Sequence, residues 1–186
     1  MRARPIVLLS LVLGAHTAHA ECPTTPDDAV CRPWSAVLVP TALGAIYVPQ
    51  EGPTFFGGGF EAILIAWSDN SEAFGPSHGR VRVDFRYLEG NGEDAGSMVM
   101  SRGGAQVAFE RNASRAYGIP YFATDVGLLW SEGTGRRWFV DAGLGIYFVH
   151  KRSFIVDAEV TGLLPFRDPD VLGGVTSRIA VSFALW

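Results

Sequence analysis

A segment of alternating charged and apolar residues, Arg80 to Tyr87, constrains the fold of this chain more than any other feature. It reads R-V-R-V-D-F-R-Y, so the charged side chains have one parity and the apolar side chains have the other. A helix would scatter these charges around its circumference, whereas a β-strand places all of them on one face. The segment therefore predicts a strand with one charged face and one apolar face.

The same alternation recurs along the rest of the chain, between connections rich in Gly, Asn, Asp and Pro. It predicts eight strands, at roughly residues 34–48, 54–68, 80–88, 97–110, 118–130, 137–150, 154–164 and 175–186. The second strand is ambiguous, because Glu61 has the same parity as Ile63 and Ile65. No segment after residue 20 reads as a helix, so the chain is expected to be all-β.

Most of these strands have one continuous apolar face, and the opposite face holds small residues and charges. Arginine beside a carboxylate is the usual bidentate pairing for charges that must be buried. If the second face is buried, its charges are therefore expected to form a salt-bridge network. The residues of this expected network are Glu61, Arg80, Arg82, Asp84, Arg86, Glu110, Asp125, Asp141, Asp157, Glu159 and Arg178.

Two architectures are compatible with this alternation. A soluble barrel or sandwich turns its apolar face inward, whereas a membrane barrel turns its polar face inward and its apolar face to lipid. The second face is rich in Gly, Ala and Ser, which suits a narrow barrel interior. Lys151 is the only lysine in the sequence, and aromatic residues such as Trp130 and Trp138 lie near strand ends. The pattern favours a closed, antiparallel, up-and-down, eight-stranded transmembrane β-barrel over residues 34–186.

The N-terminus has the three parts of a secretory signal peptide. Arg2 and Arg4 precede an apolar run over residues 5–15, and an A-x-A motif ends at Ala20. The apolar run is shorter than the roughly 20 residues that a membrane-spanning helix needs. Residues 1–20 are therefore expected to be a signal peptide that is cleaved after Ala20.

Residues 21–33 form a polar segment that contains both cysteines of the chain, Cys22 and Cys31. Export to an oxidising compartment favours a disulfide between them, although two free thiols or an intermolecular bridge remain open. The full chain has 15 basic and 19 acidic residues, and residues 1–20 contain two of the arginines and none of the acids. The exported part then carries 13 basic and 19 acidic residues, a net charge of −6, which argues against a nucleic-acid partner.

These features together resemble the small outer-membrane β-barrel proteins of Gram-negative bacteria, the eight-stranded OmpA/OmpX-like barrels. The resemblance covers about residues 34–186. It rests on the signal peptide, the amphipathic strands, the D-A-G-L-G-I-Y segment at 141–147 and the aromatic end of the last strand. It implies that Phe183, Leu185 and Trp186 belong to the signal read by the barrel assembly machinery. It also implies location in the bacterial outer membrane, contact with lipid and lipopolysaccharide, and a non-enzymatic structural or surface-interaction role.

Two other functions remain open at this point. Some outer-membrane barrels are lipid A deacylases with a histidine and a serine two residues apart, but His150 and Ser153 are three apart and straddle an expected turn. We therefore expect no enzymatic activity, and no cofactor or metal site. A secreted soluble barrel that binds an apolar ligand is the other alternative. The acidic residues of the outward connections further suggest contact with lipopolysaccharide through divalent cations.

Overall fold

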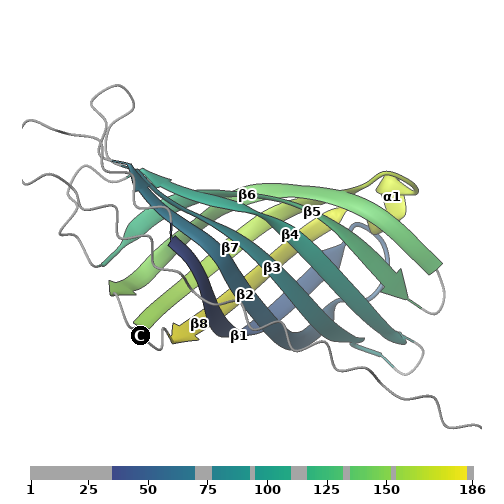
Figure 1. Cartoon of the computed structure of the whole chain (residues 1–186). Coiled ribbons are helices and arrows are strands. Elements are labelled where there is room, and N and C mark those ends of the chain that lie inside the picture. Colours follow the sequence, from purple (N-terminus) through teal and green to yellow (C-terminus); the bar gives the residue numbers. More distant parts are fainter. Residues whose placement is uncertain are drawn as a thin grey trace, which may run out of the picture.

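The computed structural model describes residues 35–69, 77–92, 95–109, 117–131, 135–151 and 154–183. Within these ranges, eight antiparallel strands pair in sequence order, and the first also pairs with the last, so the sheet closes into a barrel (Figure 1). The expected all-β, up-and-down, eight-stranded closed barrel is thus confirmed. The strands are β1 (Ser35–Pro49), β2 (Phe55–Asp69), β3 (Ser77–Gly90), β4 (Ser97–Phe109), β5 (Ile119–Ser131), β6 (Gly135–Lys151), β7 (Phe154–Pro165) and β8 (Gly174–Phe183).

One short helix, α1 (Pro169–Leu172), interrupts the connection from β7 to β8. No segment after residue 20 was expected to be helical, so this four-residue helix corrects that expectation. Proline is favoured in the first turn of a helix, because its missing amide hydrogen has no partner there anyway. Asp170 adds a negative charge in the same first turn, where it favours the positive end of the helix dipole. Among the described residues, no helix is long and apolar enough to cross a lipid bilayer.

A β-bulge resolves the ambiguity of β2. The pairing of β2 with β3 shifts between Ile63 and Ile65, so one extra residue is inserted at this point. Glu61 and Ile63 are almost completely buried. Leu64, which lies between the residues paired with Arg82 and Val81, is 39% exposed. A one-residue shift moves the following side chains to the opposite face of a strand. This is why strict alternation failed to assign β2.

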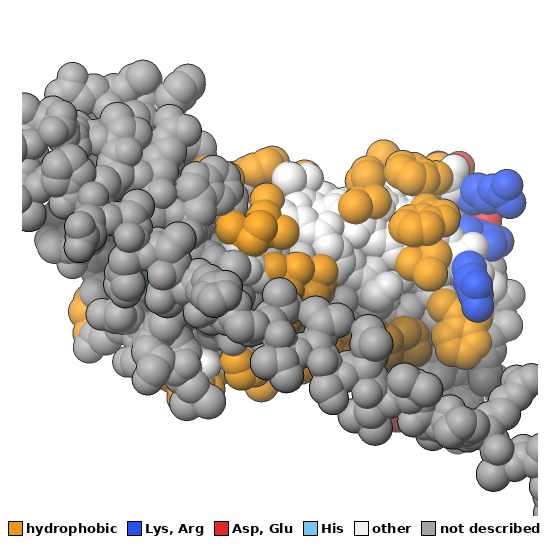
Figure 2. Space-filling view, in the orientation of Figure 1, with side chains coloured by type: hydrophobic (Ala, Val, Ile, Leu, Met, Phe, Trp, Pro, Cys, Tyr) orange, Lys and Arg blue, Asp and Glu red, His pale blue; other side chains and the backbone are white. Residues whose placement is uncertain are grey.

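On each strand, the side chains that share a face with the charged residues point into the barrel, and the apolar side chains on the opposite face point outward. The side chains of β5 alternate between buried and exposed over almost its whole length. Among the side chains whose burial is described, large exposed apolar ones occur on seven of the eight strands, and they include Phe85 on β3, Leu144 on β6 and Ile179 on β8. Figure 2 shows such side chains on the visible part of the barrel wall. The molecule is therefore apolar outside and charged inside.

The two ends of the barrel differ. We call the end that carries the connections after β1, β3, β5 and β7 the loop end, and it includes α1. We call the opposite end, where β1 begins and β8 ends, the terminal end (Figure 1). At the loop end, α1 spans the seam between β1 and β8. The amide of Gln50 donates to the carbonyl of Gly173 at 2.6 Å, and the amide of Glu51 donates to the carbonyl of Val171 at 3.3 Å.

Candidate functional site

Charged side chains fill the middle of the barrel interior, and we call this group the charged layer. Ten of the eleven residues expected to form a network lie in it, and each is at most 5% exposed. The eleventh, Glu110, lies outside the described residues. Arg102 and Gln106 of β4 are also part of the layer. The full set is Glu61, Arg80, Arg82, Asp84, Arg86, Arg102, Gln106, Asp125, Asp141, Asp157, Glu159 and Arg178.

The carboxylate of Glu159, on β7, has the most partners in the charged layer. Its Oε1 accepts hydrogen bonds from Arg82 Nη2 at 2.8 Å and from Arg102 Nη2 at 3.1 Å. Its Oε2 accepts from Gln106 Nε2 at 2.7 Å and from Arg178 Nη2 at 3.3 Å. These donors come from β3, β4 and β8, so a single side chain connects strands around the whole barrel.

Arg82 is completely buried and lies among three carboxylates. Its Nη2 is 2.7 Å from Asp125 Oδ2 and 2.8 Å from Glu159 Oε1, and its Nη1 is 3.3 Å from Glu61 Oε2. These acids belong to β5, β7 and β2. The central arginine of the R-V-R-V-D-F-R-Y segment therefore reaches across the lumen and not only to its neighbouring strands.

Two further arginines share Asp157 at the side of the charged layer nearer the terminal end. Arg178 Nη2 lies 2.9 Å from Asp157 Oδ1, and Arg80 Nη2 lies 2.8 Å from Asp157 Oδ2. Arg178 also contacts Glu61 Oε2 at 2.9 Å. The guanidinium carbon of Arg80 lies 4.8 Å from the centre of the Tyr147 ring, which is a cation–π arrangement.

Arg102 and Arg86 share Asp84 nearer the loop end. Arg102 Nε lies 2.6 Å from Asp84 Oδ2, and Arg86 Nη2 lies 3.0 Å from the same oxygen. Arg102 Nη1 is also 2.9 Å from Asp141 Oδ2 and 3.2 Å from Asp125 Oδ2. Each arginine of the charged layer thus has at least one carboxylate oxygen within 3.0 Å. Burying charges costs several kcal/mol each, and only such close, multiple pairing offsets that cost.

The charged layer contains one more acid than base. It has six carboxyl groups and five guanidinium groups among the described residues. Asp125 and Asp141 face each other directly across the pairing of β5 with β6, so two acids meet at this point. One oxygen of Asp141, Oδ1, has no hydrogen-bond partner among the described residues. The negative excess is therefore concentrated at this pair.

Apolar clusters close the charged layer on both sides. The loop-end cluster consists of Leu43, Ala45, Tyr47, Phe55, Leu88, Met98, Met100, Leu129, Phe139, Leu163 and Ala180. The terminal-end cluster consists of Ala108, Ile119, Tyr121, Ala123 and Tyr147, with Ile155 packed against it. All of these residues belong to the inward parity of their strands, so the interior holds apolar clusters beside the charged layer, and Ala180, which pairs with Asp157, lies at the level of the charges.

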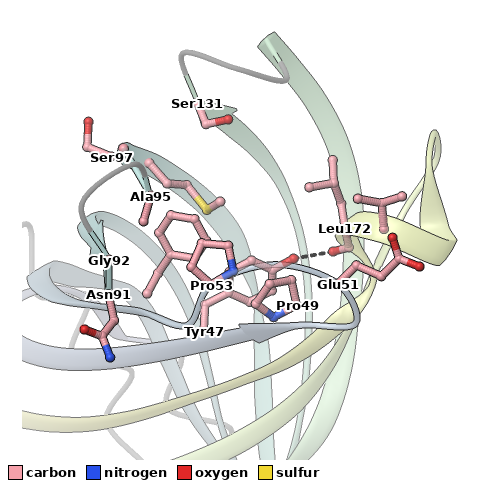
Figure 3. Close-up of a pocket in the computed structure, with 14 residues that line it drawn as sticks. Tyr47, Pro49, Glu51, Pro53, Asn91, Gly92, Ala95, Ser97, Ser131 and Leu172 are labelled. Carbon is pink, nitrogen blue, oxygen red and sulfur yellow. Dashed lines mark hydrogen bonds between the residues drawn. The ribbon is translucent and has the colours of Figure 1, made fainter.

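A pocket of about 610 Å³ opens at the loop end, outside the loop-end cluster (Figure 3). Tyr47, Phe55 and Met98 belong to both the cluster and the pocket lining. The Tyr47 hydroxyl donates a hydrogen bond to the carbonyl of Leu172, which holds α1 at one edge of the pocket. None of the lining residues belongs to the charged layer. The pocket therefore lies on the loop-end side of the barrel, apart from the charged layer.

The residues considered for catalysis and for metal binding do not come together in the part of the chain that the structure describes. The ring of His150 lies 4.9 Å from the ring of Tyr147, and Ser153 lies outside the described residues. No group of three His, Cys, Asp or Glu side chains in the described ranges is placed to hold a metal ion. The expected signal peptide, the expected Cys22–Cys31 disulfide and residues Leu185 and Trp186 also lie outside these ranges.

The outward position of Phe183 agrees with the apolar face expected for the last strand. Its side chain is 54% exposed, and its ring centre lies 5.2 Å from that of Phe154 on β7. This is the position of an outward aromatic near the terminal end of the barrel. Its role in assembly stays a prediction.

Sequence reasoning missed some residues of the charged layer and its surroundings. Arg102 has the same parity as Gln106 in β4, so the alternation of this strand already predicts that the Arg102 side chain points into the barrel. Tyr121 also binds the charged layer, since its hydroxyl donates a hydrogen bond to Asp157 Oδ1 at 2.7 Å. Counting charged residues could not identify it, because its side chain is neutral. Thr176 likewise accepts a hydrogen bond from Arg86 Nη1 at 3.0 Å.

The arrangement is that of a closed barrel in which charged interior groups bind one another. The pocket at the loop end is lined mainly by apolar side chains. Comparisons of the chain with protein-family models, with curated proteins and with solved structures find no match.

Proposed function

We propose that the protein is a non-enzymatic β-barrel of a bacterial outer membrane with a structural or surface-interaction role. One observation carries the proposal: the charged side chains are buried inside the barrel and the apolar side chains are exposed outside. In water this distribution is unfavourable, because it exposes large apolar side chains and desolvates eleven ionisable groups. In a bilayer the exposed apolar side chains are solvated by lipid, and the charged side chains are favoured inside the barrel because lipid excludes them from its outer face.

Strand length and closure support the same proposal. The strands contain 10 to 17 residues, and a tilted strand needs about 9–11 residues to cross a bilayer. Closure leaves no strand edge with unpaired backbone groups, which lipid could not hydrogen-bond. Exposed Trp130 and Trp138 near the loop end and Phe148 and Phe183 near the terminal end have the distribution of two interfacial aromatic belts.

The same observation argues against a soluble carrier of apolar ligands. Such a barrel holds its ligand in an apolar interior, as lipocalins do. Here the middle of the interior is occupied by arginines and carboxylates that bind each other. The spacing of His150 and Ser153 by three residues also departs from the two-residue spacing of the lipid-modifying enzymes considered above. The signal peptide, the disulfide and recognition by the assembly machinery remain part of the proposal.

A pair of substitutions on the outer face of β8 tests the membrane placement. Ile179, beside Arg178 near the middle of the strand, is 60% exposed, and Val175, near the loop end, is 49% exposed. In a bilayer, Ile179→Arg is expected to lower the free energy of unfolding by about 2–4 kcal/mol, and Val175→Arg by only about 0–1 kcal/mol. Urea unfolding of both variants in lipid vesicles measures this difference.

Two results would contradict the proposal. A soluble barrel exposes both positions to water, so near-equal and small effects of the two substitutions would exclude lipid around β8. Recovery of the exported protein in the soluble fraction, with the same gel mobility before and after boiling, would exclude a membrane barrel altogether. The proposal expects membrane fractionation and heat-dependent mobility.

A further inference from the structure

The described arginines outside the barrel interior gather in one place. They are Arg136 and Arg137 at the start of β6 and Arg167 just after β7, all at the loop end. Figure 2 shows these basic side chains grouped at one end of the barrel, next to exposed apolar side chains. All other arginines whose side chains are described belong to the charged layer. Among the side chains that the structure describes, these three arginines form one localised basic sector of the outer surface.

The strands place this sector directly beside exposed aromatic rings. Arg136 pairs with Trp130 across β5 and β6, so both side chains leave the same outer face. Trp138 lies two residues further along this face and is 60% exposed. The amide of Phe166 donates to the carbonyl of Trp138 at 2.9 Å, which brings the next residue, Arg167, to the same edge.

One arginine of the sector, Arg137, has an acidic partner among the described residues. Arg137 Nε donates to Asp168 Oδ2 at 3.0 Å. Within the described part of the chain, the guanidinium groups of Arg136 and Arg167 form no ion pair, and both side chains are exposed. We call Arg136 and Arg167 the arginine pair. These two groups are available to an anion that approaches from outside the barrel.

We propose that the arginine pair binds the phosphate groups of an anionic lipid at the loop end of the barrel. The inference rests on the proposed membrane placement. Exposed Trp rings of membrane proteins lie at the level of the lipid headgroups, so Trp130 and Trp138 set the depth of this part of the barrel. Arg136 lies opposite Trp130 and two residues beyond Trp138 toward the loop end, so its long side chain can reach the level of the phosphates. A guanidinium group presents two parallel donors to a phosphate, which a lysine cannot do.

This contact differs from the cation-bridged contact suggested by the sequence. The exposed acids Glu51 and Glu89 lie at the ends of β1 and β3, away from β5, β6 and β7, whereas Asp168 lies in the basic sector and binds Arg137. The described acids form no group that could hold a divalent cation. Direct binding by arginine needs no cation, so chelation is expected to leave it intact.

The experiment measures lipid A bound to the purified barrel by native mass spectrometry, after reconstitution with lipid A or with phosphatidylcholine. The wild-type barrel is expected to retain lipid A preferentially. An R136Q/R167Q variant is expected to retain it about 10- to 30-fold less tightly, because each basic side chain near an anionic surface contributes about 1 kcal/mol. An R136K/R167K variant is expected to fall between the two, because it keeps the charge and loses the bidentate geometry.

Glu89→Gln is the matched control, because it removes a charge from the same rim outside the arginine pair, and it is expected to retain lipid A. Equal retention by wild type and R136Q/R167Q would overturn the proposal while leaving membrane placement intact. Displacement of lipid A by inorganic phosphate would overturn it in favour of a free-anion site. Failure of the wild-type barrel to enter either lipid would overturn the membrane placement, and this proposal with it.

Discussion

Glu159 shows how a single side chain can carry much of the stability of this interior. Its carboxylate binds arginines from β3, β4 and β8, and each of these arginines is desolvated. Removing one partner of a buried ion pair leaves the other charge uncompensated, and this costs more than the pair itself contributes. Asp141 is the opposite case, because it faces another acid, Asp125.

We therefore predict opposite behaviour for two amide substitutions. Glu159→Gln is expected to lower the free energy of unfolding by about 3–5 kcal/mol, because three arginines lose a shared negative charge. Asp141→Asn is expected to change it by less than about 1 kcal/mol, because it removes the excess charge while its amide oxygen still accepts from Arg102. Urea unfolding of both variants in the same micelles measures the difference. Equal losses would show that the layer does not depend on which acid is neutralised.

At the scale of the element, β2 depends on glycine where the barrel wall curves. Gly59 lies on the inward parity of Glu61, and a Cβ built there would collide with the carbonyl oxygen of Phe85 on β3. Gly44 on β1 lies in an ordinary part of the wall, where the nearest atom to a built Cβ is 4.0 Å away. A glycine inside a strand often marks such a close backbone approach.

These two glycines give a prediction with its own control. Gly59→Ala is expected to destabilise the barrel by about 1–3 kcal/mol, because neither backbone can move without disturbing the pairing of β2 with β3. Gly44→Ala is expected to be neutral or slightly stabilising, because it only restricts the unfolded chain. Thermal unfolding in detergent reports both effects. A tolerated Gly59→Ala would mean that the β2–β3 wall relaxes more easily than its geometry indicates.

The strands could be predicted from the sequence because a two-residue period is a local property. The alternation located all eight strands to within a few residues and assigned the inward charges of β3, β5, β7 and β8. It failed at β2, where the bulge breaks the period, and at α1, which is too short to have a period. It could not tell which arginine binds which acid, because that depends on how all strands are staggered around the barrel. Arg82 contacts acids from β2, β5 and β7, and no local pattern encodes this.

For the molecule as a whole, the layered interior predicts a barrel that does not conduct ions. A path through the lumen would cross the loop-end cluster, the charged layer and the terminal-end cluster. Eight-stranded barrels are just wide enough for their side chains to fill the interior. Recordings in planar bilayers are therefore expected to show no steady current, with a general porin as the positive control. Stable conductance steps from the folded protein would contradict the closed interior.

The long reach of the ion pairs also has a consequence for the order of events during folding. Arg178 and Glu61 are 117 residues apart in the chain, and Arg82 and Glu159 are 77 apart. No partial set of neighbouring strands brings these groups together, because contacts so distant in sequence form only when the chain has nearly finished folding. Until β8 meets β1, Arg178 and Glu61 stay apart and hydrated, whereas neighbours such as Asp84 and Arg102 can already pair on adjacent strands. Expulsion of water and closure of the seam are then one late event, and the ion pairs slow the opening of the finished barrel more than they speed its formation.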